Sequence, residues 1–139
     1  MSLAAQISLG PTASEVRRLN NWLDEKFTES GISQSLAADL KLCLNEIIAN
    51  LIAYGFKDTP DPFTSLEIEL QPQRASATVV DNGSYFDIRA WEPPAGRNLA
   101  TAEPGGFGVA LIKERATHIA YERKGYFNCL SIVCEVASR

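Results

Sequence analysis

Two polar residues, Glu46 and Asn50, stand four positions apart within the otherwise apolar stretch 40–54. A separation of four places two side chains on one face of a helix, one turn apart. A carboxylate there can act as a general base, and an amide oxygen is a suitable neutral ligand for Mg²⁺. The alternative is a partly exposed polar stripe on a surface helix. The flanking residues 47–49 and 51–53 leave little surface for solvent, so both polar groups need partners.

A second polar group follows a run of β-forming residues. Asp81, Asn82 and Gly83 come directly after 78–80, which reads Thr-Val-Val. All three residue types favour turns, so an ordinary turn is one interpretation. In the other interpretation, the Asp81 carboxylate at the end of a strand accepts a hydrogen bond from the amino group of a nucleobase. Gly83 then allows the backbone to approach closely.

Three glycines lead into an apolar segment farther along the chain. Gly105, Gly106 and Gly108 precede the run 109–112, which we expect to be helical. Glycines before a helix expose backbone N–H groups at its positive end, where a phosphate can bind. The pattern matches neither a P-loop nor a dinucleotide-binding fingerprint. The alternative is a helix N-terminus with a flexible entry.

The composition excludes several classes of protein. The chain has 139 residues, which suits one domain, and a net charge of −4, which argues against a general nucleic-acid binder. Three cysteines without a Cys-x-x-Cys pair and a single histidine predict neither a disulfide framework nor a multi-histidine metal site, and they fit a cytoplasmic setting. No apolar run approaches the roughly 18 residues that a bilayer span needs, so we expect no membrane segment.

Hydrophobic periodicity predicts the elements that position these residues. Ser14 is the expected N-cap of the first helix, and Ser33 or Ser35 begins the second. The expected order is an edge strand (7–9), two helices (14–30 and 33–54), a hairpin (66–70 with 75–80), a long irregular segment (87–104), a third helix (109–116) and a final hairpin (118–122 with 129–136). Because helices and strands come in blocks, we expect one α+β domain over 1–139. It would be a two-layer sandwich with a mixed, mostly antiparallel sheet and helices on one face.

Taken in order, the motifs resemble the ATP-binding domain of the GHKL (histidine-kinase-like, Bergerat-type) superfamily. The motifs are Glu46-x-x-x-Asn50, Asp81-Asn82-Gly83-x-x-Phe86-Asp87 and Gly105-Gly106-x-Gly108-x-x-Leu111-Ile112. More narrowly, the chain is similar to the RsbW-like branch of bacterial anti-sigma-factor serine/threonine kinases, because 121–125 and 128–130 look like the last hairpin of that branch. The resemblance covers nearly the whole chain, from Ile7 to Val136.

The resemblance implies roles for five of these residues. Glu46 would be the catalytic general base toward a protein hydroxyl. Asn50 would hold Mg²⁺ and so contribute to binding of the nucleotide. Asp81 would contact the adenine amino group, with Gly83 and Phe86 in the same cofactor-binding motif.

The resemblance also implies a phosphate site and a lid. Gly105, Gly106 and Gly108 would cradle the phosphates beneath a lid formed by 87–104. Arg97 is the basic residue inside that segment after Arg89, which makes it the candidate for a γ-phosphate contact. The alternative for Arg97 is a solvated loop charge.

The implied cofactors are ATP and Mg²⁺, and the implied reaction is transfer of the γ-phosphate to a serine or threonine of a STAS-type anti-anti-sigma protein. Family members also bind a sigma factor, commonly as homodimers. Arg17 and Arg18 on the first helix form a candidate partner surface, whose alternative is a solvated basic face. The second function in view is a nucleotide-responsive module that sequesters a sigma factor or regulator without phosphorylating it. Glu46 favours the kinase, because a pure binder does not need that carboxylate.

The chain departs from the family pattern at two places. Tyr54 stands where many relatives carry histidine, which alters a lid or phosphate contact. No Gly-Thr pair occurs near the last strands, which weakens the adenine side of the expected pocket.

Overall fold

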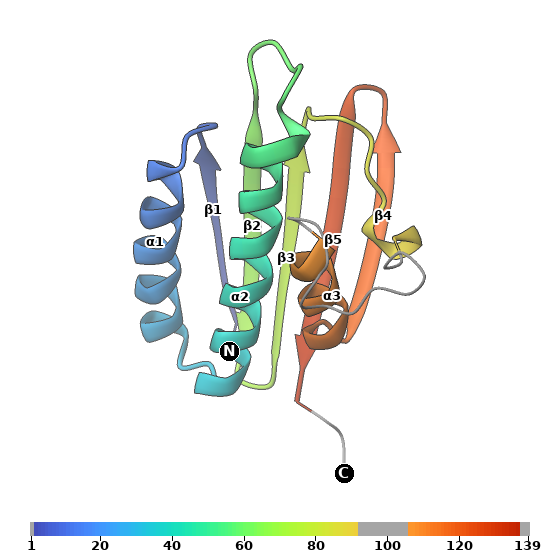
Figure 1. The fold of residues 1–139 in the computed structure, drawn as a ribbon. Helices are drawn as coiled ribbons and strands as arrows, with labels where there is room; N and C mark the ends of the chain where they lie inside the picture. The colour runs from blue at the N-terminus through green and yellow to red at the C-terminus, as the bar shows by residue number, and fades with distance from the viewer. Residues whose placement is uncertain (1, 92–105, 137–139) are drawn as a thin grey trace.

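The computed structural model describes residues 2–91 and 106–136, and within them five strands pair into one sheet that carries three α-helices on one face (Figure 1). The strands are β1 (Leu3–Leu9), β2 (Thr64–Gln71), β3 (Arg74–Asp81), β4 (His118–Lys124) and β5 (Phe127–Glu135), in the spatial order β1-β2-β3-β5-β4. The helices are α1 (Ser14–Ser30), α2 (Gln34–Asn50) and α3 (Gly106–Arg115).

The order of elements and the α+β class are confirmed. The strand pairings of the described residues are all antiparallel, so the sheet is more uniform than the mixed one expected. The last strand, β5, lies between β3 and β4. This insertion brings the end of β3 beside the start of β5, where Asp81 pairs with Asn128.

The core lies between the sheet and the three helices. Strand β3 alternates buried and half-buried positions, and its buried side chains face the helices. Helix α2 packs against β3 and β5, and it buries an unusually large part of its circumference. Its buried side chains are Leu36, Leu40, Cys43, Leu44, Ile47 and Ile48. None of the described helices is long and apolar enough to cross a membrane.

Polar side chains on α2 fasten it to its neighbours. Asn45 exchanges two hydrogen bonds with Asn20 of α1, at 2.9 and 2.6 Å. Lys41 pairs with Asp24 of α1 at 2.9 Å. The polar residues that interrupt the apolar pattern of α2 therefore join the two helices side by side.

The first helix has the predicted bounds but a different N-cap. Ala13, not Ser14, is the N-cap, and no side chain caps the first turn. The Ser14 hydroxyl instead bonds that of Thr12 at 3.0 Å. Glu15 holds the preceding chain, since its Oε1 accepts a bond from the Gly10 N–H at 2.7 Å. The N-cap prediction was wrong because Ser14 is already the first helical residue and its hydroxyl pairs with Thr12.

The second helix was expected to reach Tyr54, but the α-helix ends at Asn50. A π-helical turn, η1 (Leu51–Gly55), follows it. The Phe56 N–H bonds the Leu51 carbonyl at 2.9 Å, five residues back, as a π turn requires. The Gly55 carbonyl accepts a bond from the Ser84 N–H at 3.0 Å. The π turn is thus tied to a distant segment, a contact that a periodicity in the sequence cannot reveal.

The core predicts a sharp contrast between two neighbouring leucines of α2. Leu44→Ala should lower the free energy of unfolding by about 3 kcal/mol, because Leu44 is fully buried and a cavity would remain. The control Leu42→Ala should cost less than about 1 kcal/mol, because Leu42 is partly exposed and lies outside the core cluster. Urea unfolding of both variants measures the difference. Equal losses would contradict this packing of α2.

Candidate functional site

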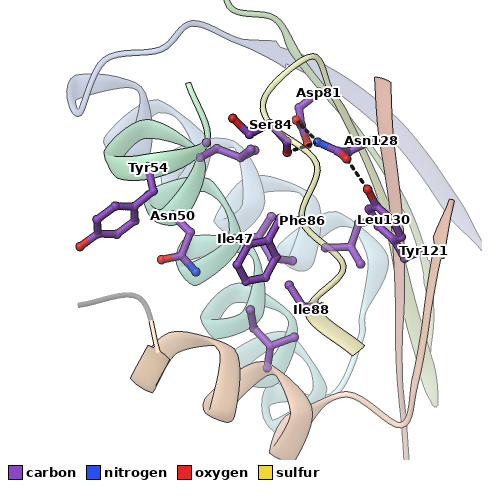
Figure 2. A pocket seen from close by; sticks show the side chains of 13 residues that line it. Ile47, Asn50, Tyr54, Asp81, Ser84, Phe86, Ile88, Tyr121, Asn128 and Leu130 are labelled. Carbon is purple, nitrogen blue, oxygen red and sulfur yellow. Dashed lines mark hydrogen bonds between the residues drawn. The ribbon is translucent and has the colours of Figure 1, made fainter. Parts of the chain in front are cut away.

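A cavity of about 90 Å³ lies where β3 ends, between α2 and the β4–β5 pair (Figure 2). Its walls come from segments far apart in the sequence. They are Ile47 and Asn50 of α2; Leu51, Tyr54 and Gly55 of η1; Asp81 of β3; Ser84, Phe86 and Ile88 from the segment after β3; Ile112 of α3; Tyr121 of β4; and Asn128 and Leu130 of β5. Three residues singled out in the sequence, Asn50, Asp81 and Phe86, therefore line one pocket. Most of the wall is apolar, which suits the flat faces of an aromatic ring.

Asp81 is a buried carboxylate at the end of β3, 4% exposed. Its Oδ1 accepts hydrogen bonds from the Gly83 N–H at 2.8 Å and from Asn128 Nδ2 at 2.9 Å. Burial raises the pKa of Asp81, while the bonds from Asn128 and Gly83 and the charge of Arg123 act in the opposite direction. Both bonds that described residues donate to this carboxylate end on Oδ1. The other oxygen, Oδ2, is thus the atom left to accept a donor from the pocket.

The segment after β3 is held against η1 at Gly83. A Cβ placed on Gly83 would lie 2.8 Å from the Gly55 carbonyl oxygen and 3.1 Å from Asp81 Oδ1. The close approach expected at this glycine is therefore made by the protein's own backbone. The turn is also an Asx turn closed by Asp81, as the first interpretation of Asp81-Asn82-Gly83 expects.

Glu46 and Asn50 share one face of α2 but have different surroundings. Asn50, the last residue of the helix, presents its amide to the pocket, and no described residue hydrogen-bonds that side chain. Glu46, one turn earlier, lies at the junction of α2 and α3. A Cβ on Gly108 would collide with Glu46 Oε2, so a glycine in the first turn of α3 makes room for this carboxylate. The structure thus brings Glu46 and Gly108 together.

Other sequence-predicted residues fall in or beside the undescribed range 92–105. Arg97 and Gly105 lie outside the described residues. Helix α3 was expected to begin near Val109 but begins at Gly106, so Gly106 and Gly108 form its first turn. Of the expected lid, residues 87–91 are described and include a 3-10 turn, η2 (Ile88–Ala90). Lys113 of α3 holds the end of the segment 87–91. Its ammonium group donates to the Arg89 carbonyl at 3.1 Å and to the Trp91 carbonyl at 2.6 Å.

Sequence reasoning missed Asn128, a buried amide in the pocket wall. It bonds Asp81, and the neighbouring Tyr121 and Arg123 of β4 in turn bond Asn128. One signal was available, because the inward positions of β5 otherwise read Leu130, Ile132 and Cys134. A polar residue in that alternation needs partners inside the molecule.

The donor set around Asn50 suits a divalent cation that keeps most of its own ligands. The described residues contain no cluster of three or more acidic, histidine or cysteine side chains that could form a complete protein cage. Mg²⁺ is commonly held by one or two protein oxygens, together with waters and the phosphates of a substrate. A single amide at the pocket rim therefore fits Mg²⁺ that arrives with a nucleotide.

Comparison with known proteins adds the family. Residues 9–134 match the family described as "Histidine kinase-like ATPase domain". The chain belongs to this family. Membership of an ATPase family implies that the domain binds ATP, which agrees with a pocket that joins a buried carboxylate to apolar walls.

Two curated relatives are named as protein kinases. The chain is 28% identical over 134 residues to the serine/threonine-protein kinase BtrW of Bordetella bronchiseptica, which covers 94% of this chain and 93% of the relative. It is 26% identical over 91 residues to the serine-protein kinase RsbW of Listeria innocua, which covers 62% of this chain and 58% of the relative. Together with the family, these names support a kinase.

A solved structure shares the fold. A Mycobacterium tuberculosis structure with RsbU and RsbW domains matches with a TM-score of 0.67 at 16% identity. The match covers 96% of this chain and 32% of the mycobacterial chain. At this identity the likeness shows the fold alone, and it agrees with the expected GHKL architecture.

The two glycines at the site predict opposite sensitivities. Gly83→Ala should cost about 1–3 kcal/mol of stability, because its Cβ meets a backbone carbonyl that the π turn fixes in place. Gly108→Ala should be close to neutral, because its Cβ meets the mobile end of the Glu46 side chain and alanine favours the helix by about 1 kcal/mol. Urea unfolding compares the two. A larger loss for Gly108→Ala would contradict the described contacts.

Proposed function

We propose that this chain is an ATP-dependent serine/threonine protein kinase that transfers the γ-phosphate to a hydroxyl of a STAS-type anti-anti-sigma protein. One observation carries the proposal. Glu46 and Asn50 lie one helical turn apart on α2, and Asn50 and Asp81 line the same pocket. The proposed base and cation ligand are thus neighbours on one helix, and the proposed cation ligand shares a pocket with the proposed nucleobase acceptor. The names of the BtrW and RsbW relatives support the same chemistry.

The pocket suits the base of ATP. Asp81 Oδ2 would accept a hydrogen bond from the adenine amino group, and Ile47, Ile88 and Leu130 would pack against the ring. Phe86 lies in the same wall. Gly106 and Gly108, in the first turn of the ten-residue helix α3, offer backbone N–H groups at a positive helix end, which suits phosphate oxygens. We also propose phosphate contacts for Gly105 and Arg97.

The chain's own residues supply positioning more than covalent chemistry. Glu46 would accept the proton of the partner's hydroxyl as that oxygen attacks the γ-phosphorus in line. The bond from the γ-phosphorus to the bridging oxygen would break, and ADP would leave with that oxygen. Asn50 would hold Mg²⁺ by its amide oxygen. When bound, the cation neutralises phosphate charge. The space at Gly108 lets the Glu46 carboxylate stand at the α2–α3 junction without displacement.

The regulatory setting follows from the resemblance and the relatives' names. We propose that the 139 residues work as one cytoplasmic domain, as a homodimer that also binds a sigma factor. Arg17 and Arg18 of α1 are proposed for the partner surface, and Arg18 already bonds Glu15 at 2.8 Å. A partner must therefore compete with Glu15 for that guanidinium.

Two measurements test the proposal. Calorimetry of the purified chain with ATP and Mg²⁺ should show micromolar or tighter binding, and its absence would sink the proposal. With labelled ATP, the chain should then transfer the label to a cognate STAS protein. ATP binding without transfer to any cognate STAS partner would instead favour the module that sequesters a regulator.

Glu46→Ala should reduce phosphoryl transfer by about a hundredfold or more, because the general base is lost. The affinity for ATP should stay within about threefold, since Glu46 does not line the pocket. The control Glu67→Ala removes an exposed carboxylate of β2 and should leave transfer unchanged. Transfer by the Glu46 variant at the wild-type rate would remove Glu46 from the role of base.

Asn50→Ala should weaken ATP binding in the presence of Mg²⁺ by about tenfold or more, because the cation loses its protein ligand. Binding in EDTA should change by less than about threefold. Asn21→Ala, at an exposed position of α1, is the matched control for loss of an amide. Titration calorimetry measures the affinity for ATP in both conditions, with Mg²⁺ and in EDTA. Equal weakening in the two buffers would show that Asn50 serves the nucleotide without the cation.

A further inference from the structure

Asn128 joins three neighbouring segments of the site through one buried side chain. It is 4% exposed. Its Nδ2 donates to Asp81 Oδ1 at 2.9 Å, to the Ser84 carbonyl at 2.9 Å and to the Gly83 carbonyl at 3.3 Å. Its Oδ1 accepts from the Tyr121 hydroxyl and from Arg123 Nη1, the latter at 3.1 Å. Figure 2 shows this amide between the carboxylate of β3 and the phenol of β4.

The partners of Asn128 fix which way its amide points. The Arg123 guanidinium can only donate, so it must face the amide oxygen. Backbone carbonyls can only accept, so those of Gly83 and Ser84 must face the amide nitrogen. Rotating the amide by 180° would set two nitrogens against each other and an oxygen against two carbonyls. The orientation therefore follows from chemistry and does not rest on an arbitrary assignment of atoms.

This orientation gives Asp81 a second donor. The amide and the Gly83 N–H both donate to Oδ1, and hydrogen bonds of this kind favour the ionised carboxylate over the acid. Burial by itself would favour the protonated acid. A protonated Asp81 would present an O–H donor to the pocket. An exocyclic amino group of a base needs an acceptor there, whereas a base with a carbonyl at that position needs a donor.

Few other charged or titratable groups face this carboxylate. From β4, Arg123 donates to the Gly83 carbonyl at 2.8 Å, and the Tyr121 hydroxyl bonds Asn128. From η1, Tyr54 lines the same pocket. The Asp87–Arg89 pair, bonded at 2.8 Å, lies beyond the Tyr121 ring, with the Arg89 guanidinium carbon 5.9 Å from the ring centre. Among the described groups, only Asn128 and Gly83 bond the carboxylate itself.

We propose that Asn128 is a positioning residue that holds Asp81 as an ionised acceptor and so makes the pocket prefer purines that carry an exocyclic amino group. The inference rests on the proposed binding of ATP. Tyr121 and Arg123 act through Asn128, by fixing its amide. The chain has no Gly-Thr pair near its last strands. On the adenine side of the pocket, the Asn128 amide supplies the hydrogen-bond donor to Asp81.

The test compares ATP with inosine triphosphate, which has a carbonyl in place of the adenine amino group. The wild-type chain should bind ATP at least about tenfold more tightly than inosine triphosphate, because the wrong base leaves buried polar groups unpaired. Asn128→Asp should reduce that preference by about tenfold or more. Asn20→Asp, which alters the part-buried amide pair between α1 and α2 and adds the same charge, should leave the preference unchanged.

The pH dependence separates positioning from a general structural effect. In Asn128→Asp, two carboxylates stand in contact and share one proton at low pH, which replaces the lost amide donor. As the pH rises, that proton leaves and the two charges repel. ATP binding by this variant should therefore fall by about tenfold or more between pH 5.5 and pH 8. Binding by Asn20→Asp should parallel the wild type over this range.

A second variant decides the case if Asn128→Asp does not fold. Tyr121→Phe keeps the ring and removes the hydroxyl that holds Asn128 Oδ1. It should lower the preference for ATP by about threefold to tenfold. An unchanged preference in whichever variants fold, in a chain that binds ATP, would overturn the inference alone. Failure of the wild type to bind ATP would overturn the proposed function itself.

Discussion

The site depends on burying one carboxylate at the end of a central strand. A buried charge is costly unless donors surround it. Asp81 gains its donors from two directions, from the backbone two residues on and from β5, which the topology places directly beside β3. The insertion of β5 between β3 and β4 is what makes the second donor available. The order of the strands thus meets the need of the buried Asp81 carboxylate for a second hydrogen-bond donor.

Helix α2 meets a different constraint, because it carries polar groups through a mostly buried surface. Asn45 and Lys41 are satisfied by α1, which leaves Glu46 and Asn50 to face α3 and the pocket. The π turn that follows Asn50 bonds the chain after β3 through the Gly55 carbonyl. Main-chain contacts therefore fix the position of Asn50 relative to the segment that follows Asp81.

The sequence predicted the elements well where periodicity governs them, and less well where a tertiary bond decides. Apolar spacing placed α2 and the β2–β3 hairpin because burial on one face dictates both patterns. It could not show that Gly55 bonds Ser84 or that Glu15 bonds Gly10, contacts that lie just after α2 and at the start of α1. Asn50, Asp81 and Phe86 meet in one pocket as their motifs suggested. Asn128 was not predicted, because it belongs to none of the motifs. Its only signal is a polar side chain among the buried, otherwise apolar positions of β5.

The pairing of β3 with β5 also bears on how the chain matures. Asp81 and Asn128 are 47 residues apart, and the element between them in sequence, β4, lies outside them in the sheet. Contacts of such long separation form late and slow the search for the native topology. During synthesis the pocket cannot close until β5 has left the ribosome, and the sheet edge at β3 stays open until then. A ligand of this pocket would then stabilise the paired state of β3 and β5, because it binds only after they have come together.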